Sequence, residues 1–235
     1  MTGATRPRAG RPEADGATAI RVSVREIREV PLRALRACGL SSGEAECAAD
    51  IVATAEIHER TGLASLAIET TRVPAGRVGM RLERCEGYAV VHDPAARGWL
   101  QAFVPACETA VVAGALVVPG LAAARVLDWA ALDVAERAGR VLSLSDGVRR
   151  TVVNPEGKLL RSDAADEPRP PVAGLTIRPL AGVPADTGTL ISTAAERKLR
   201  RREAVEDGVA VDAPLWTHAC SLARGFLIPD HREGR

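Results

Sequence analysis

Capping signals followed by apolar residues at helical spacing mark the first ordered segment of the chain. The pattern begins near Ile20, where Ser23 and Glu26 form an S-x-x-E capping box. In this motif each side chain satisfies a free backbone amide of the first helical turn. Pro31 falls inside the predicted helix and should kink it, because proline removes one backbone donor and clashes with the preceding turn. Gly39 is expected to end the helix as its C′ residue.

A second capping box begins another helix two residues later. It pairs Ser41 with Glu44, and Gly62 is predicted to end this helix. One face consists of small residues that suit close packing, namely Ala45, Ala48, Ala49, Val52 and Ala55. The two segments together predict an αα-hairpin.

From Gly87 onward the pattern alternates between strands and helices. Strands are predicted at Tyr88–His92, Ala115–Val118, Val141–Ser145, Arg149–Val153 and Leu175–Ile177. Helices are predicted at Gly98–Ala113, Ala122–Ala138, Ser192–Glu203 and Ala213–Arg224. Turn signals on both sides of Arg149–Val153 predict a β-meander. The polar, proline-rich segment Ser162–Pro171 is expected to be an exposed loop.

This order of elements predicts an α+β fold, with an N-terminal helical hairpin packed on a mixed α/β sheet domain. Residues 1–19, rich in Gly, Ala, Pro and Arg, predict a disordered arm. Residues 20–80 are then the N-terminal helical segment and residues 81–235 the sheet domain. A chain of 235 residues can bury about 70% of its unfolded surface, so it needs no disulfide or metal to hold its fold.

The charge balance and the scarcity of aromatic residues narrow the range of partners. Lys and Arg number 31 against 30 Asp and Glu, which leaves a net charge of +1 and no electrostatic footprint for nucleic acid or an anionic membrane. Aromatic residues make up only 3% of the chain, which argues against a base-stacking surface. A DNA-binding helix-turn-helix is the alternative interpretation of the hairpin. Its second helix, however, carries acids that phosphate would repel, namely Glu44, Glu46, Asp50, Glu56 and Glu59.

Other sequence features predict a cytoplasmic location. No run of about 18 apolar residues occurs, so no membrane span is expected. Met1–Ala19 lacks the apolar region of a signal peptide. The five cysteines are odd in number and none lies in a C-x-x-C motif, which predicts buried free thiols.

Several segments resemble, in the same order, the helices and strands of the malate/L-lactate dehydrogenase family, which also contains ureidoglycolate and sulfolactate dehydrogenases and cyclic-imine reductases. The segments are 22–59, 66–79, 87–118, 128–147 and 196–213. The resemblance implies that family's fold, NAD(P) as the cofactor and a homodimer that shares its sites. The family's cofactor is not held by a G-x-G-x-x-G loop, so the absence of that motif here carries no information.

The motifs that carry the family's chemistry have no counterpart here. Thr61–Ser65 stands where the family has a Ser-His-Gly step, whose His is understood to transfer the proton during hydride transfer. Leu66–Ile68 stands where an Arg pairs with the substrate carboxylate, and Val118–Arg125 lacks a second family His. Ser162–Pro168 replaces the Gly-Thr-Asn-Pro step near nicotinamide, and the chain stops at Arg235, where the family continues. Loss of a positioned acid alone removes about 10²–10⁴ in rate.

The histidines offer one catalytic candidate and no metal site. His58 lies near the position of the missing Ser-His-Gly step and could be a relocated acid, with Arg60 two residues later as the accompanying catalytic candidate. A solvated histidine near a helix C-terminus, stabilised by the helix dipole, is the alternative interpretation. His92, His218 and His231 share no i,i+3 or i,i+4 spacing with another histidine, so no metal ligand set is predicted.

A run of cations in the predicted helix Ser192–Glu203 is the candidate binding site for a cofactor. Arg197, Arg200 and Arg201 would share one face of that helix and could receive a phosphate or carboxylate. A solvated face with Glu203 and Glu206 as neighbours is the alternative interpretation.

These observations lead to three hypotheses about function. The first is a divergent malate/L-lactate dehydrogenase-like protein without the family's catalytic His and Arg, retooled as a small-molecule enzyme or an accessory subunit in specialised metabolism. The second is an active NAD(P)H-dependent reductase of 2-oxo acids or cyclic imines. The third is an interaction protein without a catalytic site. A homodimer or another protein partner is expected to cover apolar surface in each case.

Overall fold

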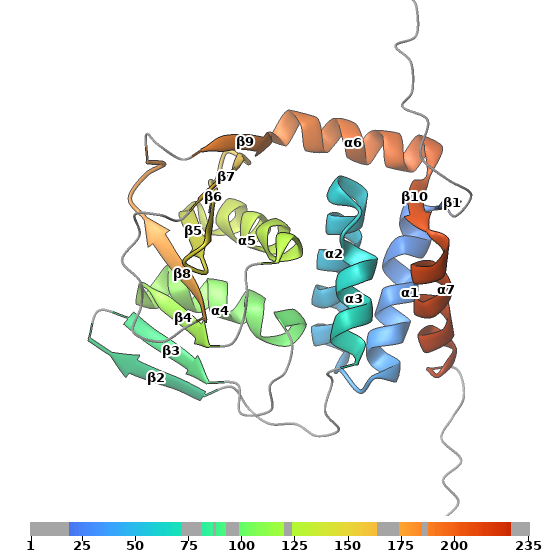
Figure 1. Ribbon diagram of the computed structural model, residues 1–235, viewed down its shortest axis with the longest axis horizontal. Helices are drawn as coiled ribbons and strands as arrows, with labels where there is room; N and C mark the ends of the chain where they lie inside the picture. The colour runs from blue at the N-terminus through green and yellow to red at the C-terminus, as the bar shows by residue number, and fades with distance from the viewer. Residues whose placement is uncertain are drawn as a thin grey trace, which may run out of the picture.

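The fold consists of a helical body, a middle pair of helices and an eight-stranded mixed sheet (Figure 1). The computed structural model describes residues 19–71, 81–86, 88–92, 99–119, 124–163, 174–184 and 188–226, apart from the side chains of residues 99–102. The described helices are α1 (Val24–Ala37), α2 (Ser42–Glu59), α3 (Gly62–Thr70), α4 (Trp99–Ala113), α5 (Arg125–Ala138), α6 (Ala194–Asp207) and α7 (Ala213–Arg224). Residues 1–18 of the predicted arm lie outside the described residues.

The strands form the eight-stranded sheet and a separate two-stranded ribbon. The described strands are β1 (Ala19–Val22), β2 (Arg81–Cys85), β3 (Tyr88–His92), β4 (Leu116–Pro119), β5 (Val141–Ser145), β6 (Arg149–Val153), β7 (Leu159–Asp163), β8 (Gly174–Leu180), β9 (Thr189–Ser192) and β10 (Val209–Asp212). The large sheet has the order β2-β3-β4-β8-β5-β6-β7-β9, and β1 pairs with β10. Among the described strands only β3 and β4 pair in parallel, and α4 connects them. The predicted meander is confirmed by the antiparallel strands β5, β6 and β7.

The middle helices α4 and α5 join the helical body to the sheet. Helix α4 packs on β3, β4 and β8, and α5 packs on β5 and β6. On their other side both helices contact α2. The core between these layers includes Phe103 of α4, Leu127 of α5 and Leu142 of β5, which are completely buried. The predicted α+β class and its mixed sheet are therefore confirmed, with the hairpin reaching the sheet through α4 and α5.

The predicted capping signals define the helical hairpin. Both capping boxes are present, since Ser23 pairs with Glu26 and Ser41 with Glu44. Helix α1 continues through the buried Pro31, and Gly39 follows its end with a φ of +94°. The alanines of α2 are buried and let α1, α3, α4 and α5 approach this helix closely.

Both ends of the described chain contribute to the helical body. Strand β1 pairs with β10, and α7 packs along α1 (Figure 1). Segments on both sides of the predicted division at residues 80 and 81 therefore build this body. Among the described helices, none combines the length and the apolar character needed to cross a bilayer.

Some predicted boundaries are wrong. Helix α2 ends at Glu59 rather than at Gly62, because Arg60 adopts the left-handed conformation with a φ of 57° and reverses the chain. Ser162, predicted in a loop, belongs to β7, whereas residues 164–171 of that loop lie outside the described residues. Ser192, predicted as a helix residue, ends β9. The errors at Ser162 and Ser192 fall in short strands that form by pairing with other strands, which sequence periodicity does not register.

Gly62 is the first residue of α3 and lies against the backbone of α2. A Cβ atom at this position would lie 2.0 Å from the Val52 carbonyl oxygen. The buried Glu56 carboxylate accepts a hydrogen bond from the Leu63 amide at 3.0 Å, which satisfies an amide that Thr61 leaves without a side-chain cap. The start of α3 is thus packed closely and hydrogen-bonded to α2.

Gly62→Ala is expected to lower the free energy of unfolding by about 1–3 kcal/mol, because the methyl group forces α3 away from α2. Urea unfolding measures this loss. Gly43→Ala is the matched control, since a Cβ atom at Gly43 meets nothing within 4 Å. It should leave stability unchanged or raise it slightly, as alanine favours a helix. Equal stabilities for the two variants would contradict the close packing at Gly62.

Candidate functional site

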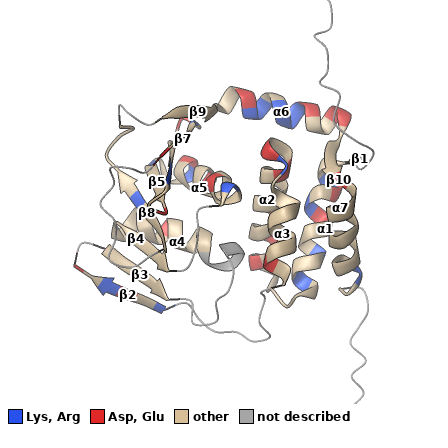
Figure 2. Cartoon of the chain, viewed as in Figure 1, with Lys and Arg blue, Asp and Glu red and all other residues tan. Residues whose placement is uncertain are grey.

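A cleft with a volume of about 450 Å³ opens between α2, α5 and α6, and we call it the α6 cleft. Its apolar wall is formed by Ile51 of α2, Val104 of α4 and Leu132 of α5. His58 of α2 and Trp129 of α5 line it as well. The opposite side belongs to α6, whose basic residues lie in the middle of the helix with acids toward both ends (Figure 2). The cleft thus combines an apolar wall with a basic helix, which is typical of small-molecule sites.

Helix α6 spans the gap between β9 and β10 and is held mainly by polar contacts (Figure 1). Ala204 is its only buried residue. Arg197 donates a hydrogen bond to the Gly157 carbonyl oxygen at 2.5 Å and forms an ion pair with Glu136. Arg200 donates to the His58 carbonyl oxygen at 2.5 Å. These two arginines fasten the helix to the sheet side and to α2, respectively.

His58 is an unusual histidine because it is buried, stacked and incompletely hydrogen-bonded. The residue is only 9% exposed, and its ring stacks on Trp129 with 4.7 Å between centroids and 23° between planes. Its Nδ1 atom is buried and has no hydrogen-bond partner. Burial, together with the positive charges of the nearby α6 arginines, lowers the pKa of His58 to about 4. The imidazole is therefore uncharged at pH 7, and almost no imidazolium is present to act as a general acid.

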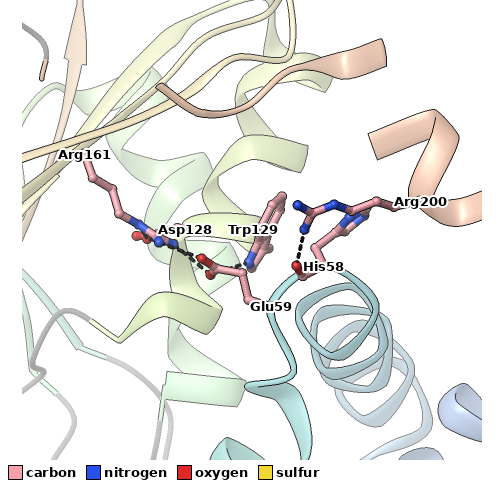
Figure 3. A network of polar contacts seen from close by, with 6 residues as sticks. All are labelled: His58, Glu59, Asp128, Trp129, Arg161 and Arg200. Carbon is pink, nitrogen blue, oxygen red and sulfur yellow. Dashed lines mark hydrogen bonds and ion pairs between the residues drawn. The ribbon is translucent and has the colours of Figure 1, made fainter. Parts of the chain in front are cut away.

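A buried ion-pair network lies next to this histidine (Figure 3). Arg161 of β7 binds Glu59 of α2 through two hydrogen bonds of 2.6 and 2.8 Å. The same guanidinium donates from Nε to Asp128 of α5 at 2.7 Å, and Trp129 Nε1 donates to Glu59 at 3.0 Å. The side chains of Arg161, Glu59 and Asp128 are 17%, 13% and 5% exposed. The network joins α2, α5 and the sheet behind the α6 cleft, and it fixes the Trp129 ring on which His58 stacks.

The two carboxylates of the network differ in how readily they bind a proton. Burial raises the pKa of Asp128 to about 6, although Arg161 opposes the rise. Burial also opposes ionisation of Glu59, but the hydrogen bonds and the charge of Arg161 outweigh it and hold the pKa of Glu59 below its usual value. Arg161 thus keeps Glu59, to which it donates two hydrogen bonds, fully ionised at neutral pH. It stabilises the charge of the more deeply buried Asp128 less effectively.

A second cleft, with a volume of about 660 Å³, lies on the other side of α6. It brings together His58, Arg60 and Arg200. Acidic residues outnumber basic ones in its lining. The lining contains the cations Arg21, Arg60 and Arg200 and the acids Glu56, Glu59, Glu203 and Asp207. The predicted cations are therefore divided, since Arg197 and Arg201 line the α6 cleft instead. His58 lines both clefts, so it is the residue that the predicted catalytic and binding groups share.

The stretch that the sequence resemblance matches to the family's catalytic His and Arg lies only partly in the core, since Ile68 is 55% exposed. Residues 62–70 form α3, and Leu63 and Leu66 are each 1% exposed. Of the segment compared with the nicotinamide-binding step, Ser162 and Asp163 belong to β7, and residues 164–168 lie outside the described residues. Within the described parts of the chain, no group of three or more His, Cys, Asp or Glu side chains could hold a metal ion.

Sequence reasoning found His58 but missed Glu59, Asp128, Trp129 and Arg161. An available signal was Asp128, an acid placed among apolar positions of a helix, which requires a cationic partner if it is buried. The partner could not be identified, because Arg161 lies 33 residues from Asp128 and 102 residues from Glu59.

No family model matches the sequence, and no curated protein matches it. The structure is similar to a dehydrogenase from Sinorhizobium meliloti, with a TM-score of 0.61 and 13% identity over 88% of this chain and 100% of that one. It is also similar to malate dehydrogenase from Pyrococcus horikoshii OT3, with a TM-score of 0.57 and 11% identity over 92% of this chain and 99% of that one. A third similar structure is delta1-piperideine-2-carboxylate reductase from Pseudomonas syringae pvar. tomato, with a TM-score of 0.55 and 12% identity over 86% of this chain and 99% of that one. The chain therefore has the malate/lactate dehydrogenase type of fold that the sequence resemblance predicted.

Proposed function

We propose that this dehydrogenase-like protein no longer reduces 2-oxo acids or cyclic imines and instead binds a small molecule in the α6 cleft, as a retooled enzyme or an accessory subunit of specialised metabolism. One observation carries the proposal. Leu63 and Leu66, in the stretch compared with the family's proton-transferring His and carboxylate-binding Arg, are apolar and buried in the core. Neither leucine can deliver a proton or bind a carboxylate.

The chemistry of reduction explains why this matters. Hydride transfer to a 2-oxo acid builds negative charge on an oxygen, which needs a positioned acid, and the substrate carboxylate needs a cation. His58, the imidazole nearest to that stretch along the sequence, is neutral at pH 7 and stacked on Trp129. The α6 cleft, in contrast, offers a concave surface of a volume that suits a metabolite. The homodimer, the cytoplasmic location and the division at residue 80 stay predictions from the sequence.

The test combines a turnover assay with a melting screen. NADH and NADPH should support no oxidation above background with a panel of 2-oxo acids and cyclic imines. A metabolite panel should contain compounds that raise the melting temperature, since a ligand of the folded state stabilises it by RT ln(1 + [L]/Kd). Turnover that His58→Gln abolishes would favour the active reductase and sink the proposal. A panel without any rise would favour the interaction protein.

A further inference from the structure

The charges that line the α6 cleft are unevenly paired. All three of its acids already have an arginine partner within ion-pair distance. The three pairs are Asp50 with Arg28, Asp133 with Arg137, and Glu136 with Arg197. These carboxylates are therefore not available to neutralise further cations of the cleft.

Two cations of the lining have no partner among the described residues. Lys198 and Arg201 line the cleft, and within the described part of the chain neither forms an ion pair or a hydrogen bond. They lie three residues apart on α6, so both side chains can face the same side of the helix. The contacts of Arg197 and Arg200 on either side hold this part of the helix in place. The result is a pair of exposed positive charges on a helix that is held in place beside the cleft.

The apolar wall of the cleft and His58 do not neutralise the charges of Lys198 and Arg201. Ile51, Val104 and Leu132 present hydrocarbon, and His58 is an uncharged ring at pH 7. A ligand that is complementary to both the apolar wall and the two cations has an apolar part of a few carbon atoms and an anionic head group. A cationic or purely polar ligand would leave either the charges or the apolar wall unmatched.

We propose that the α6 cleft binds a small organic anion, a carboxylate or a phosphate ester, whose head group pairs with Lys198 and Arg201 and whose apolar part packs against Ile51, Val104 and Leu132. This inference rests on the proposed function, since it names the class of molecule that the cleft takes. Neither the second cleft, whose lining is acidic in balance, nor the buried network, which is internally paired, offers such a site.

Calorimetric titration with three probes of one shape tests the proposal. Benzoate and phenyl phosphate carry the two kinds of head group, and benzamide replaces the charge with a neutral amide. Benzoate or phenyl phosphate should bind at least about tenfold more tightly than benzamide, because a hydrogen bond to a charged group is worth that factor or more. The better of the two anions identifies the head group. Raising the salt concentration should weaken the anions and leave benzamide unaffected.

Variants locate the charge. Lys198→Gln and Arg201→Gln should each weaken anion binding about tenfold, and the double variant should abolish the preference over benzamide. Arg202→Gln is the matched control, because Arg202 lies on the same helix, is exposed, pairs with Glu206 and does not line the cleft. It should bind all three probes like the unmodified protein.

The possible failures differ in meaning. Benzamide binding as tightly as the anions, or anion binding that survives in the double variant, overturns the inference but leaves the proposed function standing. Silence of all three probes at tens of millimolar overturns the inference too. In that case the metabolite screen alone decides whether the cleft binds a small molecule.

Discussion

Arg161→Met is expected to lower the free energy of unfolding by about 3–5 kcal/mol, measured by urea denaturation at pH 8. The substitution keeps the apolar stem of the side chain and removes the guanidinium that neutralises Glu59 and Asp128. Asp128 is buried and the Glu59 side chain is only 13% exposed, so water replaces the lost partner poorly. The loss is the energy of two uncompensated charges in the interior rather than the net value of the ion pairs.

The loss should shrink at lower pH. Without Arg161 the folded-state pKa values of Glu59 and Asp128 rise, so the folded variant binds protons that the unfolded chain has already released. A raised folded pKa adds stability as the pH falls toward the unfolded values near 4. The variant should therefore come closer to the unmodified protein at pH 5 than at pH 8.

Two further variants separate charge from packing. Adding Glu59→Gln and Asp128→Asn to Arg161→Met removes both stranded charges and keeps an acceptor for Trp129, so much of the lost stability should return. Arg137→Met breaks exposed pairs with Asp133 and Glu108 and should change stability by less than about 1 kcal/mol. A triple variant no more stable than Arg161→Met would show that lost packing, not charge, dominates.

The helices that the sequence predicted correctly carry their own local signals. The capping boxes at Ser23 and Ser41 and the left-handed Gly39 act within one helical turn, so neighbouring residues determine them. The missed strands lack such signals. Strand β1 exists through pairing with β10 almost two hundred residues away, and β9 through pairing with β7. Pairing between strands that are far apart in the sequence produces no hydrophobic periodicity within either strand.

The candidate site likewise has a part that the sequence predicted and a part that depends on tertiary contacts. His58 and the α6 arginines could be named because few histidines and one dense cationic run occur in the chain. Which arginine serves which cleft depends on the rotation of α6 over α2. The contacts of Arg200 with the His58 carbonyl oxygen and of Arg197 with Gly157 determine that rotation. Tertiary contacts of this kind are invisible to spacing along the helix.

His58 should make the protein less stable as the pH falls from 6.5 to 4. Its folded pKa of about 4 lies below the value near 6.5 of an unfolded chain, so in this window the unfolded state binds the extra proton. Stability from the neutral ring is complete above pH 6.5 and lost as the pH approaches 4, by about 3 kcal/mol in total. At pH 5 the loss should be about 2 kcal/mol.

The acidic residue Asp128 acts in the opposite direction and hides part of this effect. Its folded pKa of about 6 lies above the unfolded value, so it adds stability as the pH falls through 6. Between pH 7 and pH 5 the contributions of His58 and Asp128 to the stability of the unmodified protein should consequently offset each other in large part. A difference between two proteins that share Asp128 removes its contribution and isolates the histidine.

His58→Gln supplies that difference, because glutamine fills part of the same space and does not titrate. Urea unfolding of both proteins at pH 7 and pH 5 should show the variant gaining about 2 kcal/mol relative to the unmodified protein on acidification. His218→Gln, which removes an exposed imidazole from α7, provides the baseline. The positive charges of Arg197, Arg200 and Arg201 assist burial in keeping the ring neutral, whereas Glu59 opposes them. A stability difference that does not change between the two pH values would mean that His58 is solvated in the folded protein. That result would contradict the description of His58 as a stacked, uncharged ring that lines the α6 cleft.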